Sequence, residues 1–306
     1  MKLALGSLLY YWSRETTLAF YAMMESAPVD IVYLGETVCS RRHELRLSDW
    51  LGIAARLRAA GKEVVLSTQV LIESGSDVAV LHKIAGNTNF QVEANDMGAV
   101  HYLSSQASQA SQSPQSSKQP FVLGAHLNIY NLPTLQMLAS LGAQRWVMPL
   151  EMGRDDLALI QRERPANLQT EVFVFGRMPL AFSARCFTAR HRNVPKDDCQ
   201  FSCIDYPDGL LMRTREDESF LILNGTQTQS ARVHLLLKEL EDMCTLGVDV
   251  VRVSPQANHT LDILHIFDAI LKGRYSAAQA QQAISPYLLD KACNGYWYGQ
   301  PGLDQR

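Results

Sequence analysis

The sequence has no excess of positive charge. It contains 28 lysine and arginine residues against 31 aspartate and glutamate residues, and its formal net charge is -3 over 306 residues. Proteins that hold nucleic acid through its phosphates need a basic patch or stripe. We therefore expect a globular protein whose partners do not include nucleic acid.

Long apolar runs are missing as well. No stretch approaches the roughly 20 residues that a helix needs to span a bilayer, so we expect no transmembrane segment. The opening residues, MKLALGSLLYYW, faintly resemble a signal peptide, but the apolar run is short, contains aromatics and precedes no small-residue cleavage site. We interpret them as a β-strand and expect a cytoplasmic protein with reduced cysteines.

Signatures of the common hydrolases are also absent. The chain contains no GxSxG nucleophile elbow, no HExxH zinc pair and no local signature of a cysteine nucleophile. Nothing in the sequence therefore indicates peptidase chemistry, and the catalytic residues stay unassigned.

The most informative feature that is present is a cluster of cysteines. Cys186, Cys199 and Cys203 make up half of the six cysteines and fall within eighteen residues, in RCFTARHRNVPKDDCQFSC. Soft thiolates this close together are typical ligands of an iron–sulfur cluster or a zinc ion, and the basic residues between them favour the thiolate. Zinc ribbons pair cysteines two to four residues apart, and only one pair here is that close, which favours iron–sulfur. Thiols without a metal are the remaining alternative.

A cubane cluster usually takes four thiolates, so a fourth ligand has to come from elsewhere in the chain. Cys39 follows the predicted strand VDIVYLGE and is therefore expected on the same face as the cysteine-rich stretch, which makes it our preferred ligand. We expect Cys244 to be buried in a helix, and Cys293 reaches the site only if the C-terminal tail folds over it. His191 is the alternative, because zinc and some clusters accept histidine.

Alternating strand-like and helix-like segments predict an α/β fold. Eight such units in this length favour a (β/α)8 TIM-like barrel over a doubly wound open sheet. Helix signals include Ser48-Asp49, Asp96 and Pro133, and the segment ARVHLLLKELEDMCTLG has the amphipathic pattern of a helix ending at Gly247. The predicted strands are LALGSLLYYW, VDIVYLGE, KEVVLST, NFQVEAND, FVLGAHLNIY, QRWVMPLE, TEVFVFGR and VDVVRVSP.

We expect one barrel domain over residues 1–306, with two departures from the regular alternation. The Ser/Gln/Ala-rich residues 104–118 predict a disordered loop. An insertion over residues 180–230, between strands seven and eight, contains the clustered cysteines and a predicted hairpin of GLLMRTR and SFLILNG. It follows the carboxyl end of a strand, where barrel enzymes have their active sites, so we predict that it binds the metal.

Polar side chains recur where the predicted strands end, and in a barrel these positions converge at the mouth. Arginines, carboxylates and amides together suit a polar, anionic small molecule. Arg41 and Arg42 either serve the same anion, tune the cluster or form a solvated loop, and His43 and His191 are weaker acid–base candidates. The predicted substrate-binding residues are Glu36, Glu93, Asn95, Asn128, Glu151, Arg177 and Arg252, with Thr68, Asp96 and His126 at equivalent positions.

Several motifs resemble the collagenase-like peptidase family. They are VYLGETVCSRR, VEANDMGAV, LNIYN, PLEMGRD and RCFTARH with CQFSC, and the resemblance runs from the first strand to the last. The resemblance implies a [4Fe–4S] cluster on Cys39, Cys186, Cys199 and Cys203. It also implies a heterodimer with a UbiU-like protein that carries a comparable cluster.

The activity that the resemblance implies is that of an O2-independent hydroxylase subunit. Its substrates would be the aromatic rings of intermediates in anaerobic ubiquinone biosynthesis, with prephenate as the suggested oxygen donor. One alternative is a family relative that hydroxylates RNA bases, although the negative net charge counts against it. Another is a non-catalytic scaffold and oxygen sensor in which the cluster is a structural staple.

Overall fold

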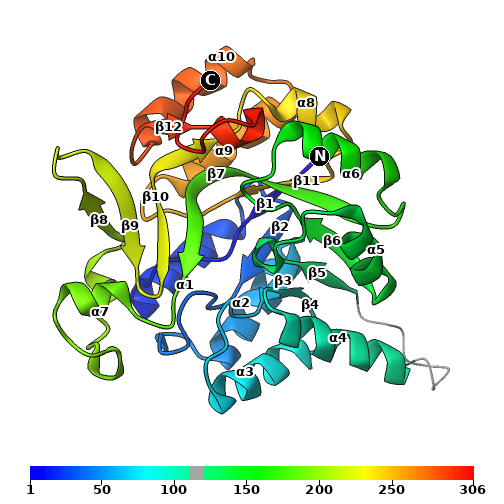
Figure 1. The fold of residues 1–306 in the computed structure, drawn as a ribbon. Helices are drawn as coiled ribbons and strands as arrows, with labels where there is room; N and C mark the ends of the chain where they lie inside the picture. Colours follow the sequence, from blue (N-terminus) through cyan, green and yellow to red (C-terminus); the bar gives the residue numbers. More distant parts are fainter. Residues whose placement is uncertain (111–119) are drawn as a thin grey trace.

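Eight parallel strands close into a barrel in the computed structural model, which describes residues 1–110 and 120–306 and, of residues 106–110, only the backbone. Each strand pairs with the next along the barrel, and β11 pairs with both β1 and β7, which closes the circle (Figure 1). The predicted TIM-like barrel is thereby confirmed and the open sheet excluded. The strands are β1 (Lys2–Leu5), β2 (Ile31–Leu34), β3 (Glu63–Ser67), β4 (Gln91–Ala94), β5 (Phe121–Leu123), β6 (Ala143–Val147), β7 (Gln169–Phe182) and β11 (Val250–Val253).

Helices cover the outside of the barrel (Figure 1). Several begin where a side chain caps the first turn: the Asn131 and Asp96 side chains each accept a hydrogen bond from the backbone N–H three residues ahead. Near the predicted start at Ser48, α2 begins at Leu47. No helix in the described residues combines the length and apolar composition needed to cross a membrane. The helices are α1 (Arg14–Met24), α2 (Leu47–Ala59), α3 (Gly75–Ala85), α4 (Met97–Ala110), α5 (Leu132–Ser140), α6 (Arg154–Glu163), α8 (Leu240–Thr245), α9 (Thr260–Leu271) and α10 (Ala277–Ile284).

The barrel strands bury side chains on both faces because successive residues point in opposite directions. Outward-facing residues join the main apolar cluster with the helices, and it includes the fully buried Trp146, Phe121 and Phe175. A separate apolar cluster contains strand residues alone and fills the interior of the barrel. Its members are Ala4, Ile31, Tyr33, Val65, Val122, Val147 and Val250.

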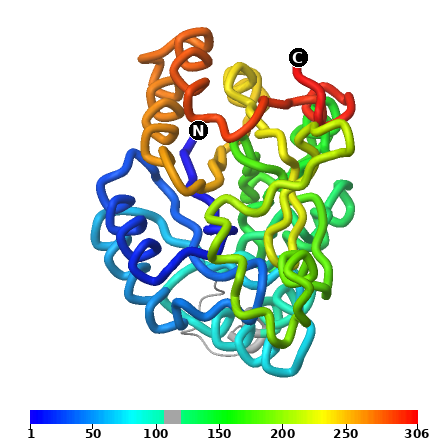
Figure 2. Tube along the Cα trace, turned by 90° about the vertical axis from the view of Figure 1, so that its left-hand side faces the viewer, coloured from blue at the N-terminus to red at the C-terminus, as the bar shows by residue number. Residues whose placement is uncertain are grey.

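The insertion between β7 and β11 is built on an extension of β7. This strand continues past the barrel and pairs antiparallel with β10 (Gln227–Leu235), which pairs in turn with β9 (Ser219–Asn224) and β8 (Leu210–Arg213). The β8–β9 pair confirms the predicted hairpin. In the view turned by 90° the insertion lies toward the viewer, over the carboxyl ends of the barrel strands, and both termini lie in the upper part of the view (Figure 2).

The segment that carries the clustered cysteines connects β7 to β8. It consists of three short helices, α7 (Phe187–His191), η2 (Lys196–Asp198) and η3 (Ser202–Asp205), joined by turns. Figure 1 shows α7 at the far side of the insertion from the termini. A short strand near the C-terminus, β12 (Ala292–Cys293), completes the sheet by pairing with β10.

Parts of the sequence prediction for this region are wrong. The segment ARVHLLLKELEDMCTLG was expected to be one helix, but its first residues belong to β10 and the helix starts only at Leu240. Cys244 was expected to be buried and is exposed on α8. An apolar run such as VHLLL fits a buried strand as well as a helix, and pairing with β7 decides for the strand.

Two further predictions differ from the structure at element ends. The first strand ends at Leu5, well before Trp12, and the fifth ends at Leu123, where the chain enters a short helix, η1 (Ala125–Leu127). Of the predicted loop over residues 104–118, residues 104–110 continue helix α4. The rest of that prediction lies outside the described residues.

Candidate functional site

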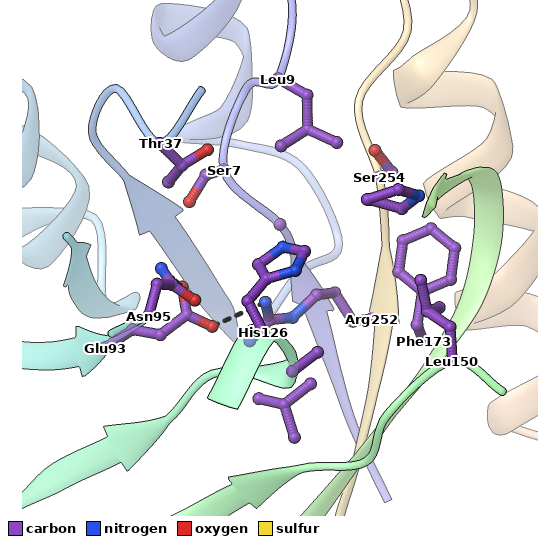
Figure 3. Close-up of a pocket in the computed structure, with 14 residues that line it drawn as sticks. Ser7, Leu9, Thr37, Glu93, Asn95, His126, Leu150, Phe173, Arg252 and Ser254 are labelled. Atoms are coloured by element: carbon purple, nitrogen blue, oxygen red, sulfur yellow. Dashed lines mark hydrogen bonds and ion pairs between the residues drawn. The ribbon is translucent and has the colours of Figure 1, made fainter. Parts of the chain in front are cut away.

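A cavity opens at the carboxyl ends of the barrel strands (Figure 3). It encloses about 550 Å³ of empty space, including its open side. Its walls come from seven barrel strands or the loops that follow them. The principal lining residues are Ser7, Leu9, Thr37, Glu93, Asn95, His126, Leu150, Phe173, Arg252 and Ser254.

Arg252, on β11, is the cation of this cavity. Its Nε lies 2.5 Å from a carboxylate oxygen of Glu171 and its Nη1 lies 2.8 Å from one of Glu93. The guanidinium stacks on the Tyr33 ring, 3.8 Å from the ring centroid. Burial alone lowers the pKa of Arg252, but the two carboxylates outweigh it and hold that pKa well above its ordinary value. Gly6 leaves room for this side chain, because a Cβ there would lie 3.2 Å from the Arg252 Cδ.

Glu93, on β4, is held by hydrogen bonds on both oxygens. The Ser67 hydroxyl donates to Glu93 Oε2 at 2.7 Å, and Ser7 and Ser67 are themselves 2.7 Å apart. Burial raises the pKa of Glu93, but Arg252 and the Ser67 hydroxyl outweigh it, so the pKa lies below its usual value. The carboxylate is therefore ionised at neutral pH and lies buried beside the guanidinium, as the dashed line in Figure 3 shows.

Asn95 follows Glu93 and is fixed by Thr68. The Thr68 hydroxyl accepts from the Asn95 backbone N–H at 3.0 Å, and the Asn95 amide donates to the Thr68 carbonyl at 2.9 Å. Gly124 is required beside it, because a Cβ at that position would lie 2.0 Å from Asn95 Oδ1. Thr68 thus acts by positioning Asn95, while Asp96 caps helix α4 through a 2.8 Å hydrogen bond from Ala99.

His126, on η1, points into the cavity (Figure 3). Its ring packs edge-on against Phe182, with ring centroids 4.9 Å apart. Burial lowers the pKa of His126 to about 4, so the imidazole is neutral at physiological pH. It can donate or accept one hydrogen bond in the cavity but adds no charge to it.

Two of the predicted substrate residues line an adjoining outer cavity instead. Asn128 and Glu151 face about 620 Å³ of empty space that shares His126 and Leu150 with the inner cavity. Asn128 is exposed with a left-handed backbone (φ 54), and Glu151 accepts a 3.1 Å hydrogen bond from the Tyr130 hydroxyl. The structure therefore brings Glu93, Asn95 and Arg252 together, with Asn128 and Glu151 nearby.

Arg177 and Glu36 have other surroundings. Arg177 lies on the extension of β7 and donates to the backbone carbonyl of Asp208, so it faces the insertion and does not line the cavity. Glu36 accepts from the backbone N–H groups of Val38 and Cys39 at 2.9 and 3.1 Å and thereby shapes the turn that carries Cys39. Both residues lie on the side of the barrel that faces the insertion.

Arg42 joins the loop after β2 to the insertion. Its guanidinium is buried, lies 3.5 Å from Glu36 and donates to the Leu9 carbonyl at 2.8 Å and to Asn224 at 2.7 Å. Burial raises the pKa of Glu36 more than Arg42 lowers it. Gly225 stands beside this contact, where a Cβ would lie 3.2 Å from Arg42 Nη2. The polar contacts of Arg42 are therefore satisfied mainly within the protein.

Three of the four predicted cysteine ligands converge beside Arg42. Cys39 and Cys203 each lie close enough to Cys186 for an electrostatic interaction, and Arg42 interacts with Cys39 and Cys203. Cys186 is the N-cap of α7 and its sulfur accepts from the Ala189 N–H at 3.4 Å. Cys199 stands at the end of η2 and, like the other three, is partly buried.

The four thiols are chemically suited to bind a metal ion or cluster that takes thiolate ligands. Their arrangement in this structure is not that of a complete set of metal ligands. Within the described residues, no group of three or more histidine, cysteine or acidic side chains is arranged to hold a metal ion. Burial raises the pKa of Cys39 to about 11 and raises that of Cys203, so these thiols need a bound cation to ionise. The buried Nε atoms of Arg41 and Arg42 have no hydrogen-bond partner among the described residues, and N–H groups so placed suit cluster sulfurs.

The other two cysteines and the acid–base candidates His43 and His191 lie outside the cavity. Cys293 is fully buried in β12, Cys244 is exposed on α8, and His191 is exposed at the end of α7. His43 packs edge-on against Phe201, with ring centroids 4.6 Å apart. The structure assigns none of them a place in the barrel cavity.

Sequence reasoning missed several cavity residues. Ser7, Thr37 and Ser254 come within three residues after a strand end, so the rule that found Asn95 could also have found them. Glu171 and Tyr33 lie within strands, with the Tyr33 hydroxyl donating to Glu171 at 2.5 Å. Arg145 continues this buried network through its contacts with Tyr33 (3.1 Å) and Glu63 (2.5 Å). No turn or motif marks such inward-facing polar residues in the sequence.

A comparison with known families decides the membership of the chain. The model of peptidase family U32 matches residues 17–304, which is most of the sequence. The chain belongs to peptidase family U32. The predicted resemblance to the collagenase-like peptidases is confirmed at this level.

Two curated relatives match only part of the chain. It is 34% identical over 110 residues to tRNA hydroxylation protein P of Helicobacter pylori strain 26695, and 33% identical over 110 residues to the protein of that name in strain J99. Each match covers 32% of this chain and 26% of the relative, so the aligned part spans about a quarter of those proteins.

Solved structures match at low identity. The U32 peptidase Mk0906 aligns with a TM-score of 0.44 at 12% identity, over 84% of this chain and 93% of that one. A chitinase-like agglutinin from Robinia pseudoacacia aligns with a TM-score of 0.39 at 11% identity, over 91% of this chain and 98% of that one.

Proposed function

We propose that this U32 protein is a UbiV-like [4Fe–4S] subunit of an O2-independent hydroxylase, which acts with a UbiU-like partner on the aromatic rings of ubiquinone precursors. The family and the partial similarity to a tRNA hydroxylation protein support a role in hydroxylation. The observation that carries the proposal is on the loop after β2, where Thr37 lines the cavity and Cys39 interacts with Cys186. A cluster bound there would adjoin the barrel mouth.

The proposed ligands of the cluster are Cys39, Cys186, Cys199 and Cys203. When bound, the cluster would supply either an electron-transfer group or a structural link between the loop and the insertion. Arg41 and Arg42 would offset its negative charge and direct N–H groups toward it.

The residues of the barrel cavity would bind and orient the ring. Arg252 and Asn95 present polar groups at fixed positions, and Phe173 and Leu150 provide apolar walls. Replacing a ring C–H by C–OH requires an oxygen atom and the removal of two electrons. The proposal therefore includes a co-substrate that gives up the oxygen atom and accepts the two electrons. Prephenate is the donor suggested by family resemblance.

The first test is the metal content of protein purified without oxygen. About four irons and four sulfides per chain, with broad absorption near 400 nm, are expected for an all-cysteine cubane cluster. The loaded protein is then incubated anaerobically with a UbiU-like partner, prephenate and a ubiquinone precursor, and the expected product is heavier by one oxygen atom. A colourless protein with stoichiometric zinc would contradict the proposal, as would a fully loaded complex that forms no hydroxylated product.

A second candidate is hydroxylation of an RNA base. It is favoured by the name of the partial relatives, and the net charge of -3 counts against it. Retention of tRNA by the purified protein at moderate salt would favour this candidate, whereas elution of tRNA at low salt would support the quinone substrate.

A non-catalytic scaffold or oxygen sensor is the alternative from a different class. Replacement of cavity residues distinguishes it, because a scaffold keeps its function as long as the cluster and the fold are intact. Loss of hydroxylation in an Asn95→Ala protein with full iron content would identify an enzyme.

A further inference from the structure

The charges in the barrel cavity are already balanced. Arg252 pairs with two carboxylates, Glu93 at 2.8 Å and Glu171 at 2.5 Å. Glu171 also lies 3.8 Å from Arg145, and Glu93 itself lines the cavity. Among the described residues that line it, Arg252 is the one cation, and His126 adds no charge because it is neutral. A carboxylate that entered would lose its hydration and meet a wall with no net positive charge, which is unfavourable.

Two hydrogen-bond donors in the same wall have no partner. Arg252 Nη2 and the Thr37 hydroxyl are buried and make no hydrogen bond within the described protein. The Arg252 side chain is 12% exposed and Thr37 is 4% exposed, so water satisfies them poorly. Figure 3 shows both residues at the cavity, Thr37 in the loop after β2 and Arg252 on β11. Buried donors of this kind favour a ligand that brings an acceptor oxygen.

The remaining walls are apolar. Leu9, Val147, Leu150, Phe173 and Pro179 line the space around these donors. A cavity with apolar walls and a few fixed polar groups is typical of sites for small organic molecules.

We propose that the barrel cavity binds an uncharged aromatic molecule whose carbonyl or hydroxyl substituents accept hydrogen bonds from the unpartnered donors Thr37 Oγ1 and Arg252 Nη2, and that it excludes carboxylates. This differs from the expectation of an anionic ligand drawn from the strand-end arginines. The inference rests on the proposed function in one respect. It assigns the cavity to the ring that is hydroxylated and not to an anionic oxygen donor.

The test compares two probes of the same shape, 4-methoxyacetophenone and 4-methoxybenzoate, by titration calorimetry on the full chain near neutral pH. The neutral ketone is expected to bind at least about tenfold more tightly than the carboxylate, because the charged group loses its hydration without compensation. Tighter binding of the carboxylate, or no binding of the ketone, would overturn the proposal.

Substitutions in the cavity wall identify the residue that contacts the bound ketone. Thr37→Val removes the unpaired hydroxyl and is expected to weaken ketone binding about fivefold. Thr245→Val, on the exposed end of α8, is the matched control and should leave binding unchanged. Unaltered ketone affinity in a folded Thr37→Val protein would refute the assigned contact.

A charge variant tests the selectivity itself. Glu93→Gln removes one of the two carboxylates beside Arg252, so the ratio of ketone to carboxylate affinity is expected to fall, with 4-methoxybenzoate gaining. An unchanged ratio in the folded variant would show that the charge balance does not control the choice. These measurements use neither the partner nor turnover, so selective ketone binding without hydroxylation would leave this inference standing and refute only the proposed function.

Discussion

The Arg42 guanidinium donates a 2.7 Å hydrogen bond to Asn224 Oδ1 in the buried space between the loop after β2 and the end of β9. Asn224 in turn donates to the Leu9 carbonyl at 2.8 Å, which also accepts from Arg42. These two side chains therefore tie the insertion to the loops that follow β1 and β2. The position of Cys39 relative to Cys186 depends on this contact.

Replacing Arg42 should destabilise the protein. In Arg42→Met the buried Asn224 amide and the Leu9 carbonyl lose a donor and Glu36 loses its charge partner, which is expected to cost about 3 kcal/mol in the free energy of unfolding. The measurement is urea unfolding followed by fluorescence. Arg213→Met, on the exposed hairpin strand β8, is the control and should change stability by less than about 0.5 kcal/mol. Equal stability of the two variants would contradict the structural role of Arg42.

Metal loading should depend on the four predicted cysteines and not on the others. We expect Cys39→Ala, Cys186→Ala, Cys199→Ala and Cys203→Ala each to abolish stable loading of iron and sulfide. Cys244→Ala, which alters an exposed thiol on α8, should retain full loading. Iron and sulfide analysis of proteins purified without oxygen checks this, and full iron content in Cys199→Ala would exclude that residue as a ligand.

Gly124 should not tolerate a side chain. A Cβ would lie 2.0 Å from Asn95 Oδ1, so Gly124→Ala is expected to displace Asn95 and to lower the free energy of unfolding by about 2 kcal/mol. Gly52→Ala is the matched control in helix α2, where a Cβ meets nothing within 4 Å, and it should stabilise the protein by about 0.5 kcal/mol. Thermal and urea unfolding of both variants measure the difference. An unchanged free energy of unfolding in Gly124→Ala would show that the loop moves to accommodate the methyl group.

Stability should fall as the solution is acidified below pH 7, in part because of His234. This residue is fully buried against Phe173, and burial lowers its pKa to about 4, whereas an exposed histidine in the unfolded chain titrates near 6.5. The unfolded chain therefore binds the extra proton first, and folding loses about 2 kcal/mol from this group between pH 7 and pH 5.

The contribution of His234 can be isolated by comparing two variants. His234→Phe should flatten the dependence of the unfolding free energy on pH, while His101→Gln, on the exposed face of α4, should leave it unchanged. Identical pH profiles for His234→Phe and the unsubstituted protein would show that His234 remains neutral in both states or charges without cost.

The barrel and the core of the site were predictable because both follow from local patterns. Strand–helix alternation indicates the fold, and polar residues after strands indicate the mouth, which is where Asn95 and Arg252 lie. Arg177 was assigned to the same mouth because its strand was expected to end there. It lies elsewhere because β7 runs on to Phe182, and strand length beyond the barrel depends on a partner strand, β10, that comes 45 or more residues later in the sequence.

The buried network beneath the cavity was not predictable by the same means. Arg145 lies between Gln144 and Trp146, and Glu171 lies between Thr170 and Val172, which are sequence contexts that an exposed polar residue of a strand could also have. Only closure of the barrel places these side chains inside and opposite one another. The balance of charge around Arg252, and with it the preference for an uncharged ligand, therefore follows from the tertiary structure alone.

The pairing of β7 on both of its edges limits how the barrel and the insertion can move. At Phe175 it pairs on one side with Val253 of β11, in the barrel, and on the other with Leu235 of β10, in the insertion. Relative rotation of two bodies requires a connecting stretch free of such pairing, and the junction at Phe175 is paired on both edges. Barrel and insertion should consequently behave as a single rigid unit, so that a protein docked on the outer hairpin would alter the cavity through strand pairing and not through a hinge.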